Sequence, residues 1–449
     1  MPKKSKKTTA EPTLYVRLQD HFGKIPAELP VLEQSFAGYE PANFQLALNE
    51  ILSELECATD SIGIVSRDWD GPSLAKISRP KMAKDFSDGP VEYVDVSLAE
   101  GQQLACIKQG LILLKVENEA VALLIHQHRH SYDRSFIAEV MGSSREVAER
   151  FLRRLTHETR LGRAFKGKIL SLETDCRGQM TVHFHRLQRI GREEIILPEE
   201  LLQRIERHTI SFSRHAERLR AAKRHLKRGI LLHGSPGTGK TLSAMYLAAQ
   251  MTGRSVILIT GQGMGSIETA CKLARMLEPA TVILEDADLI GTERGQQMLG
   301  ANSLLFELLN QMDGLAEDAD VLFILTTNRP DKLEPALAAR PGRIDQAIEV
   351  PPPDSDCRHR LIELYGRGLR LELKDREALI KRTEGVSAAF LRELLRKAAI
   401  YAAESQPDSD AELAVTDDHI AEGLNELLIA GGTLTQSLLA ARTSTIKPD

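Results

Sequence analysis

The sequence predicts an α/β protein in which a parallel-sheet domain follows a separate N-terminal α+β domain. Each of four short apolar runs in the second half is followed by a helical pattern, which is typical of a parallel sheet crossed by helices. The runs lie at 229–232, 256–259, 281–284 and 321–325. A glycine-rich loop follows the first run, and polar side chains follow the third and fourth. Polar groups at the ends of parallel strands indicate a ligand site.

The composition is that of an ordinary globular protein with room for two or three domains. Of the 449 residues 42% are hydrophobic and 27% charged, and the net charge of −5 disfavours general affinity for nucleic acid. No apolar run approaches the ~20 residues of a membrane span. The first 13 residues are polar and basic, and the five cysteines lack CxxC spacing. We therefore expect free thiols and a cytoplasmic protein with no membrane partner.

Changes in pattern divide the chain into five parts. We expect a disordered tail at 1–13, the N-terminal α+β domain at 14–190, the parallel-sheet domain at 191–352, a helical lid at 353–430 and a C-terminal tail at 431–449. In the first domain, apolar residues at helical spacing predict a helix over 43–57. The runs 111–116 and 120–125 predict a hairpin, and 169–172 and 182–185 predict further strands. Residues 357–428 are almost wholly helical in pattern.

The segment 136–147 has the appearance of a helix–turn–helix. Ser143 and Glu146 form a predicted capping box, which opens a second helix with Val147, Phe151 and Leu155 on one face. The arginines that follow are suited to phosphate; they are Arg153, Arg154, Arg160 and Arg163. Interspersed glutamates dilute that charge. A structural hairpin or a protein-interaction module is therefore favoured, and nucleic-acid binding remains the alternative.

His126, His128 and His130 alternate, so on a strand they would share one face, which suits a metal. No cysteine or carboxylate cluster in the neighbouring sequence supports zinc. We interpret them, like His183 and His185, as polar residues at partly exposed strand ends.

The glycine-rich loop fills the pattern G-x-x-x-x-G-K-[ST] between an apolar strand and a helix, the context of a nucleotide phosphate site. Its residues are Gly234, Ser235, Pro236, Gly237, Thr238, Gly239, Lys240 and Thr241, and Leu242 follows in the predicted nucleotide site. Glycines let backbone N–H groups turn toward phosphate oxygens, and the helix N-terminus adds its dipole. Lys240 would reach the β and γ phosphates of ATP, and Thr241 would offer its hydroxyl to Mg²⁺.

Polar side chains after the later strands supply the remaining candidates. Of the carboxylates Glu285 and Asp286, one is suited to hold Mg²⁺ and its neighbour to orient the attacking water. Asn328 is suited to hydrogen-bond the γ-phosphate or that water, although an Asn in this context also forms turns. Arg340 and Arg343 are either surface charges or cations that stabilise a transferring phosphate in trans.

These motifs together resemble the classical AAA clade of the AAA+ ATPases, which includes proteasome-regulatory ATPases and valosin-containing protein. The matching segments are GSPGTGKT at 234–241, ILEDAD at 283–288, QMDGL at 311–315, TTNRPDKLEPAL at 326–337, ARPGRID at 339–345 and TEGVSAAF at 383–390. They cover roughly residues 195–430. The N-terminal domain resembles no family that we can name.

The resemblance implies a P-loop, three-layer AAA+ domain with a helical lid, which assembles as a homo-oligomeric, usually hexameric, ring with ATP between neighbours. It implies that Glu285 and Asp286 are the Walker B pair, that Glu285 and Thr241 hold Mg²⁺, and that Asn328 is sensor 1. Arg340 and Arg343 would be the arginine fingers. Ala388 and Ala389 would lie near the adenine.

Two positions depart from the family pattern. The usual acidic pair is Asp then Glu, and here Glu285 precedes Asp286. The shorter Asp side chain loses about 1.5 Å of reach, which predicts slow hydrolysis or a compensating shift of the strand end. The second departure is the pore loop, which carries Met264 where polypeptide-threading members carry an aromatic residue. Met264 either grips a chain weakly or does not contact substrate.

We therefore expect a ring-forming ATPase that couples Mg-ATP hydrolysis to the remodelling, unfolding or disassembly of a protein partner. The N-terminal domain would recognise that partner or an adaptor. One alternative is a nucleic-acid-associated motor that uses the segment 134–163. Another is an assembly switch that binds ATP and seldom hydrolyses it. Neither an HExxH nor a Gly-x-Ser-x-Gly motif is present, so any proteolysis would belong to a partner.

Overall fold

The computed structural model divides the chain into two compact units, residues 1–185 and 186–449. The division falls five residues before the domain boundary predicted at 190/191. The described residues are 14–55, 60–127, 135–174, 180–186, 190–259, 267–288, 303–314, 316, 318–331, 333, 343–405 and 412–427. The tails predicted at 1–13 and 431–449 lie outside these residues.

Unit 1 is an α+β unit built on an antiparallel sheet in the order β1-β7-β6-β5-β2-β3, with β4 paired to β5. The strands are β1 (Val31–Phe36), β2 (Asp60–Ser66), β3 (Phe86–Gly89), β4 (Glu92–Ser97), β5 (Gln103–Val116), β6 (Glu119–Gln127) and β7 (Phe136–Gly142). The helices are α1 (Leu14–Phe22), α2 (Pro41–Glu54), α3 (Leu74–Ile77) and α4 (Arg145–Arg160). The antiparallel hairpin β8 (Ile169–Thr174) and β9 (Met180–His185) comes last in the unit along the chain.

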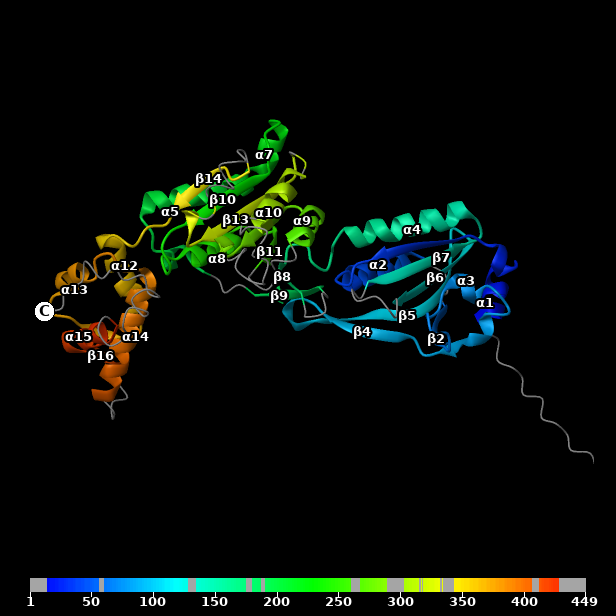
Figure 1. Cartoon of the computed structure of the whole chain (residues 1–449), viewed down its shortest axis with the longest axis horizontal. Coiled ribbons are helices and arrows are strands. Elements are labelled where there is room, and N and C mark those ends of the chain that lie inside the picture. Colours follow the sequence, from blue (N-terminus) through cyan, green and yellow to red (C-terminus); the bar gives the residue numbers. More distant parts are fainter. Residues whose placement is uncertain are drawn as a thin grey trace, which may run out of the picture. The chain divides into compact units, whose positions relative to one another are not determined.

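Helices cover both faces of this sheet. On one face α2 and α4 pack together (Figure 1) over a core that contains Phe44, Phe136 and Phe151. On the other face, Leu14 and Leu18 of α1 and Leu74 of α3 belong to a second core with Leu124. The predicted amphipathic helix at 43–57 is confirmed as α2, although it begins two residues earlier and ends three residues earlier.

The hairpin predicted around 117–119 is confirmed as β5 and β6. Val116 pairs with Glu119, so Glu117 and Asn118 form a two-residue turn. Both turn residues have positive φ, 49° and 67°. Two consecutive positive φ angles match the twist of hairpin strands, which is why this short turn joins them.

The predicted helix–turn–helix is wrong, because its first half is a strand. Residues 136–142 form β7, which lies between β1 and β6 and is buried along its whole length. Only the second half is helical, as α4. Its N-cap is Ser144, whose hydroxyl accepts a hydrogen bond from the N–H of Val147, so the capping residue predicted at Ser143 is one position early.

The interpretation of His126 as a partly exposed strand end is also wrong. His126 is only 5% exposed, and its Nε2 lies 2.9 Å from Oε1 of Glu139, itself 5% exposed. The second oxygen of Glu139 accepts a hydrogen bond of 2.6 Å from the N–H of Leu74 at the start of α3. This carboxyl group therefore joins β6, β7 and α3. His128 and His130 lie outside the described residues.

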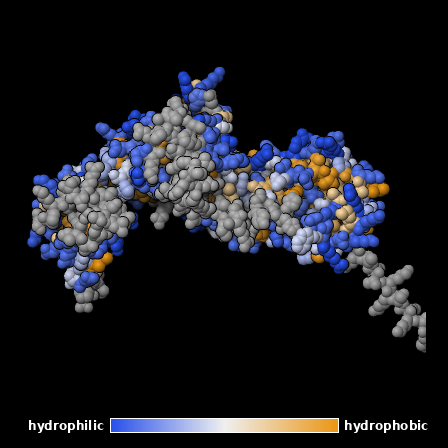
Figure 2. Space-filling model, in the orientation of Figure 1, coloured by the Kyte–Doolittle hydropathy of each residue, from blue (hydrophilic) through white to orange (hydrophobic). Residues whose placement is uncertain are grey.

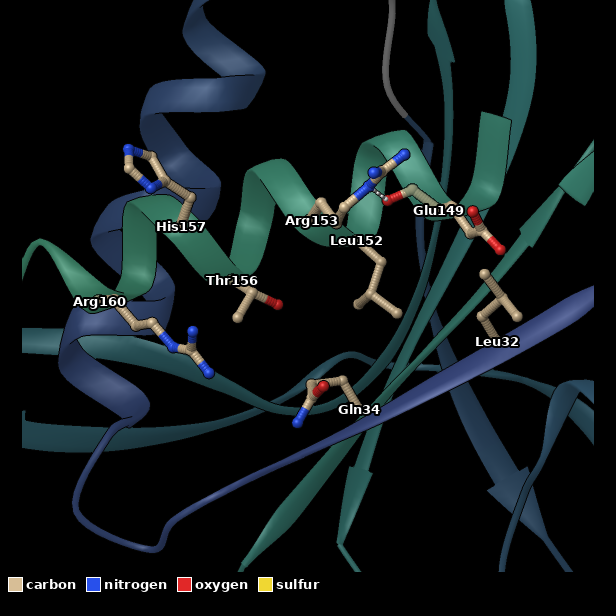
Figure 3. A pocket seen from close by; sticks show the side chains of 8 residues that line it. All are labelled: Leu32, Gln34, Glu149, Leu152, Arg153, Thr156, His157 and Arg160. Atoms are coloured by element: carbon tan, nitrogen blue, oxygen red, sulfur yellow. Dashed lines mark hydrogen bonds between the residues drawn. The ribbon is translucent and has the colours of Figure 1, made fainter. Parts of the chain in front are cut away.

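A shallow groove of about 280 Å³ lies between α4 and β1 (Figure 3). Leu152, Thr156 and Arg160 point from α4 toward β1, which contributes Leu32 and Gln34. In the space-filling view, apolar residues gather on unit 1 in the area of α4 and β7 (Figure 2).

Unit 2 contains the predicted parallel sheet, so the α/β class is confirmed. Its strands lie in the order β14-β10-β13-β12-β11. They are β10 (Arg228–His233), β11 (Ser255–Ile259), β12 (Ala280–Leu284), β13 (Val321–Thr327) and β14 (Gln346–Glu349). The helices are α5 (Glu199–Glu206), α6 (Phe212–Arg214), α7 (Ala216–Ala221), α8 (Lys240–Gln250), α9 (Ile267–Met276) and α10 (Ser303–Asp313), with η4 (Arg192–Glu194) and the π-helical turn η5 (Arg207–Ser211).

The helical lid follows β14. It comprises α12 (Ser355–Tyr365), α13 (Arg376–Arg382), α14 (Ala388–Ser405) and α15 (Asp417–Asn425). The sequence pattern missed two three-residue strands, β15 (Arg370–Glu372) and β16 (Ala414–Thr416), which pair in parallel. Among the described helices none is long and apolar enough to cross a membrane.

Three of the five cysteines fall in described segments, and all three are free, as predicted. Cys106, Cys271 and Cys357 are buried, and burial is the main cause that raises the pKa of each thiol to about 12. Because the thiolate is the reactive form, these cysteines have structural rather than chemical roles.

Candidate functional site

The candidate site lies at the carboxyl edge of the parallel sheet in unit 2. Strand β13 lies between β10 and β12 and runs parallel to both. Gly234 directly follows β10, Asn328 directly follows β13 and Glu285 directly follows β12. Three predicted site segments, far apart in the sequence, therefore come together at one edge, where ligands of parallel α/β sheets bind.

The glycine-rich loop folds around the side chain of Lys240, the first residue of α8. Lys240 is only 5% exposed, and its Nζ donates hydrogen bonds to the carbonyl oxygens of Gly234 at 3.0 Å and Ser235 at 2.8 Å. Burial lowers the pKa of Lys240, while the charges of Asp286 and Asp288 act in the opposite direction. A phosphate oxygen would offer this ammonium group a stronger, charged acceptor than a neutral carbonyl.

The loop is also in contact with the lid. The N–H of Ala389, at the start of α14, donates a hydrogen bond of 3.1 Å to the carbonyl oxygen of Gly237. A Cβ atom on Gly237 would lie 2.8 Å from Cβ of Ala389 and 2.9 Å from Oγ of Ser387. The structure thus places Ala389 beside the glycine-rich loop, with Ala388 next to it in sequence. Thr241 and Leu242, in the first turn of α8, are exposed.

Gly237→Ala is expected to weaken ATP binding by about tenfold. Gly237 has φ +75°, which costs an L-residue ~1–2 kcal/mol, and the new methyl group would also displace the lid. Fluorescent-nucleotide titration measures the change. Gly253→Ala is the matched control, because Gly253 has a similar φ of +83° with no atom near the added Cβ. Equal affinities in both variants would contradict the role of this contact.

Asp286 has an uncommon backbone conformation and contacts one residue on β13 and one directly after it. Its φ is +48°, in the left-handed region that non-glycine residues rarely adopt. Its N–H donates to Oγ1 of Thr326 at 3.1 Å, and its Oδ1 accepts a hydrogen bond of 3.1 Å from Nδ2 of Asn328. The predicted water-polarising carboxylate and the predicted sensor are therefore in direct contact.

Asp288 is a residue to which the sequence assigned no role. Its Oδ1 accepts hydrogen bonds from Oγ1 of Thr327 at 2.7 Å and from the N–H of Asn328 at 3.1 Å. These bonds fix the end of β13 and thereby orient the Asn328 amide. The signal was available, since Asp288 closes the acidic run ILEDAD.

The carboxyl group of Glu285 has the properties of a cation ligand. Its Oε1 is buried, with no hydrogen-bond partner among the described residues. Burial, followed by the charge of Asp286, raises the pKa of this carboxyl group. Carboxylate and hydroxyl oxygens are ligands that Mg²⁺ prefers. The buried oxygen of Glu285 therefore fits a Mg²⁺ ligand, and the role of Thr241 at that site stays a prediction.

The two predicted arginine fingers are placed unequally. Arg343 makes a bidentate ion pair with Asp313 at the end of α10, with Nε 2.6 Å from Oδ1. Its side chain is 13% exposed, and burial lowers the pKa of its guanidinium. Arg340 and the pore-loop residue Met264 lie outside the described residues.

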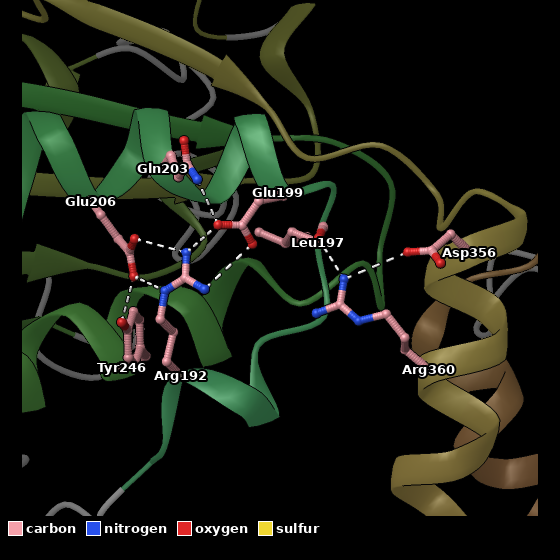
Figure 4. A network of polar contacts seen from close by, with 8 residues as sticks. All are labelled: Arg192, Leu197, Glu199, Gln203, Glu206, Tyr246, Asp356 and Arg360. Carbon is pink, nitrogen blue, oxygen red and sulfur yellow. Dashed lines mark hydrogen bonds and ion pairs between the residues drawn. The ribbon is translucent and has the colours of Figure 1, made fainter.

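A polar network fixes the segment that precedes β10 (Figure 4). Arg192 donates to both Glu199 and Glu206, and Glu206 accepts a hydrogen bond of 2.6 Å from the hydroxyl of Tyr246 on α8. On the lid side, Nη1 of Arg360 on α12 donates to the carbonyl oxygen of Leu197 at 3.4 Å. One short segment is thus tied to the helix that carries Lys240 and to the lid.

The arginines considered for nucleic acid are partly neutralised within unit 1. Arg154 forms an ion pair with Glu54, and Arg163 pairs with Glu50 and Glu158. Arg153 and Arg160 are exposed and line the groove between α4 and β1. Phosphate-binding arginines present charge to solvent, so the ion pairs of Arg154 and Arg163 weaken the nucleic-acid alternative, whereas Arg153 and Arg160 keep exposed charge.

Comparison with known proteins identifies the sheet domain. Residues 230–352 match the model of the ATPase family associated with various cellular activities (AAA). A proteasome-activating nucleotidase of Pyrococcus horikoshii is 35% identical over 187 residues, which are 39% of this chain and 47% of the relative. The 26S proteasome regulatory subunit S10B homolog B of Arabidopsis thaliana is 34% identical over 194 residues, or 40% and 48%.

An ATP-dependent zinc metalloprotease FtsH of a Synechococcus species is 35% identical over 207 residues, which are 43% of this chain and 32% of the relative. The chain thus spans about a third to a half of the length of these relatives. The family model ends before the lid and does not extend into unit 1. The resemblance seen in the sequence motifs is confirmed for the sheet domain.

Proposed function

Because residues 230–352 form an AAA ATPase domain, we propose that this chain hydrolyses Mg-ATP to remodel, unfold or disassemble a protein partner. The observation that carries the proposal is the assembly of Lys240, Asp286 and Asn328 at one edge of the sheet. A buried lysine, a carboxylate and an amide at that edge are the groups that phosphoryl transfer to water requires.

Each group has a defined task in the proposed reaction. Lys240 and the backbone N–H groups of 234–241 bind the β and γ phosphates, and Thr241 and Glu285 hold Mg²⁺, which neutralises charge that develops on the phosphate oxygens. Asp286 accepts a hydrogen bond from the attacking water and thereby orients it. Asn328 keeps Asp286 in position through the 3.1 Å hydrogen bond.

We propose further that the active form is a homo-oligomeric ring, with six subunits, in the cytoplasm. Arg340 and Arg343 of one subunit would stabilise the transferring phosphate bound to its neighbour. Unit 1, which lies outside the matched AAA segment, would recognise the protein partner or an adaptor. The contact between Ala389 and Gly237 would link the nucleotide to movement of the lid.

A mixing experiment tests the shared site. Arg343→Ala subunits keep Asp286 but lack one of the two proposed fingers, and Asp286→Asn subunits keep both fingers but lack the carboxylate. Each variant alone is expected to hydrolyse ATP slowly. A one-to-one mixture is expected to recover about a quarter of the wild-type rate, because one in four neighbouring pairs combines an intact carboxylate with an intact finger.

Phosphate release measured at several protein concentrations provides the readout. Arg329→Ala is the matched control, since Arg329 is exposed and, among the residues that the structure describes, its side chain pairs with Asp331 two positions along the chain. A mixture no faster than its two components would contradict completion of the site by a neighbour. If wild-type subunits hydrolyse ATP equally fast per subunit whether or not they are assembled, the proposal that the active form is a ring is contradicted.

A further inference from the structure

We propose that the groove between α4 and the outer edge of β1 binds an extended, acidic segment of a partner protein as an added strand. This inference deepens the proposed function, on which it rests, because it names the peptide chemistry that unit 1 would recognise. It depends on the edge of the sheet, the lining of the groove and the charge at its rim.

Strand β1 is an edge strand, since among the described strands it pairs with β7 alone. The N–H of Gly142 donates to the carbonyl oxygen of Pro30 at 3.4 Å, so these two residues form a hydrogen-bonded pair. Val31 and Met141 form the next pair of the ladder. In antiparallel pairs, hydrogen-bonded and non-hydrogen-bonded positions alternate. The backbone groups of Val31, Glu33 and Ser35 therefore point away from β7.

A row of outward backbone groups is a template for another strand. In the free chain this edge is partly covered, because Nε2 of Gln34 donates a hydrogen bond of 3.0 Å to the carbonyl oxygen of Ser35. The Gln34 side chain is exposed, so it can turn aside without exposing the core. Within the described residues, the flexible Gln34 side chain thus covers one carbonyl group of this edge.

The groove beside this edge suits side chains of an added strand. Leu32 and Leu152 supply apolar contacts, and the helix face of α4 rises above them (Figure 3). A strand added to β1 directs alternate side chains toward α4, because Leu32 and Gln34 already point to that face (Figure 3). Backbone hydrogen bonds then give affinity, and the groove gives specificity.

The rim of the groove is basic. Arg153, His157 and Arg160 are exposed along α4 at the groove. The acidic residue Glu149 is already paired with Arg145 at 2.7 Å. Complementary charge at a rim steers association and selects partners, so an acidic segment is favoured.

Two other occupants fit less well. The chain's own residues 1–13 carry four lysines and one glutamate, so their charge matches that of the rim rather than complementing it. An oligonucleotide would complement the rim, but it would use neither the outward backbone groups of β1 nor the leucines. An acidic peptide uses all three features.

Panning a library of short random linear peptides on the full-length chain, without nucleotide, provides the probe. We expect acidic, β-branched sequences to be enriched. Binding of a selected peptide is then measured for the double variant Arg153→Glu, Arg160→Glu and for Glu33→Pro, which removes an outward N–H. Lys84→Glu, at an exposed lysine on η2 (Ala83–Asp85), and Glu33→Ala are the matched controls.

The expected result is a loss of affinity of at least tenfold in the double variant and in Glu33→Pro, with both controls unchanged. Hydrogen exchange should slow at 31–35 when the wild-type chain binds the peptide, a readout that does not depend on the folding of any variant. The inference would be overturned if the selected peptides are not acidic, if the peptide protects amides elsewhere from exchange, or if all variants bind it equally. It would also be overturned if a single-stranded oligonucleotide of equal charge displaces the peptide, or if the chain forms a dimer that Glu33→Pro dissociates. ATP hydrolysis is measured in parallel, so failure of the proposed function is seen separately.

Discussion

Asp286→Asn is expected to lower the rate of ATP hydrolysis by at least ~100-fold while ATP affinity changes little. An amide has nearly the size of the carboxylate, so the backbone at φ +48° and the contact with Asn328 are retained. The amide does not orient or polarise the attacking water as a carboxylate does. Steady-state phosphate release and fluorescent-nucleotide binding, measured on the same preparation, separate the two effects.

Glu285→Gln distinguishes the two carboxylates. Because Glu285 has a buried oxygen with no hydrogen-bond partner in the described part of the chain, its loss should chiefly raise the Mg²⁺ concentration needed for half-maximal hydrolysis. Asp318→Asn, at an exposed aspartate before β13, is the matched control and should change neither quantity. If Glu285→Gln abolishes hydrolysis and Asp286→Asn does not, the assignment of the water-polarising group is wrong.

Slow ATP hydrolysis by the wild-type chain would bear on the choice between a motor and an assembly switch. The Asp side chain is one methylene shorter than Glu, and the left-handed backbone at Asp286 changes the direction in which that side chain leaves the strand. Ring assembly driven by ATP with little phosphate release would favour the assembly switch over the motor.

Much of unit 2 could be predicted because its signals are local. The strand before Gly234, the glycine loop and α8 are consecutive in sequence, and their chemistry follows from their order. Asp288 was missed because its role depends on Thr327 and Asn328, which are about 40 residues away and reach it only through the pairing of β12 with β13.

The secondary structure of unit 1 was harder to predict, because its apolar runs fit both the helical and the strand periodicity. Residues 136–142 carry apolar residues at nearly every position, which suits a buried strand as well as a buried helix. The predicted helix–turn–helix requires a turn within 136–147. In the structure Gly142 ends β7 where α4 approaches, and a Cβ atom there would lie 2.8 Å from the backbone nitrogen of Ala148.

Glu139→Ala is expected to destabilise unit 1 by about 3–5 kcal/mol, since it removes one member of a buried pair and leaves a buried N–H unpaired. The carboxyl group contacts His126 at 2.9 Å and the N–H of Leu74 at 2.6 Å. Glu139→Gln keeps the shape and one acceptor oxygen, so its cost should be only about 1–2 kcal/mol.

Hydrogen exchange resolved by peptide measures this cost within the intact chain. Peptides from β6 and β7 should exchange about 100-fold faster or more in Glu139→Ala, because each 1.4 kcal/mol is a factor of ten in the opening equilibrium. Peptides from β10 and β13 belong to the other unit and serve as the internal reference. Exchange at the wild-type rate in both variants would contradict the role of this carboxyl group in joining β6, β7 and α3. A cost in both variants that is larger for Ala would mean that a polar group, unseen in the sequence pattern, holds the apolar sheet of unit 1 in register.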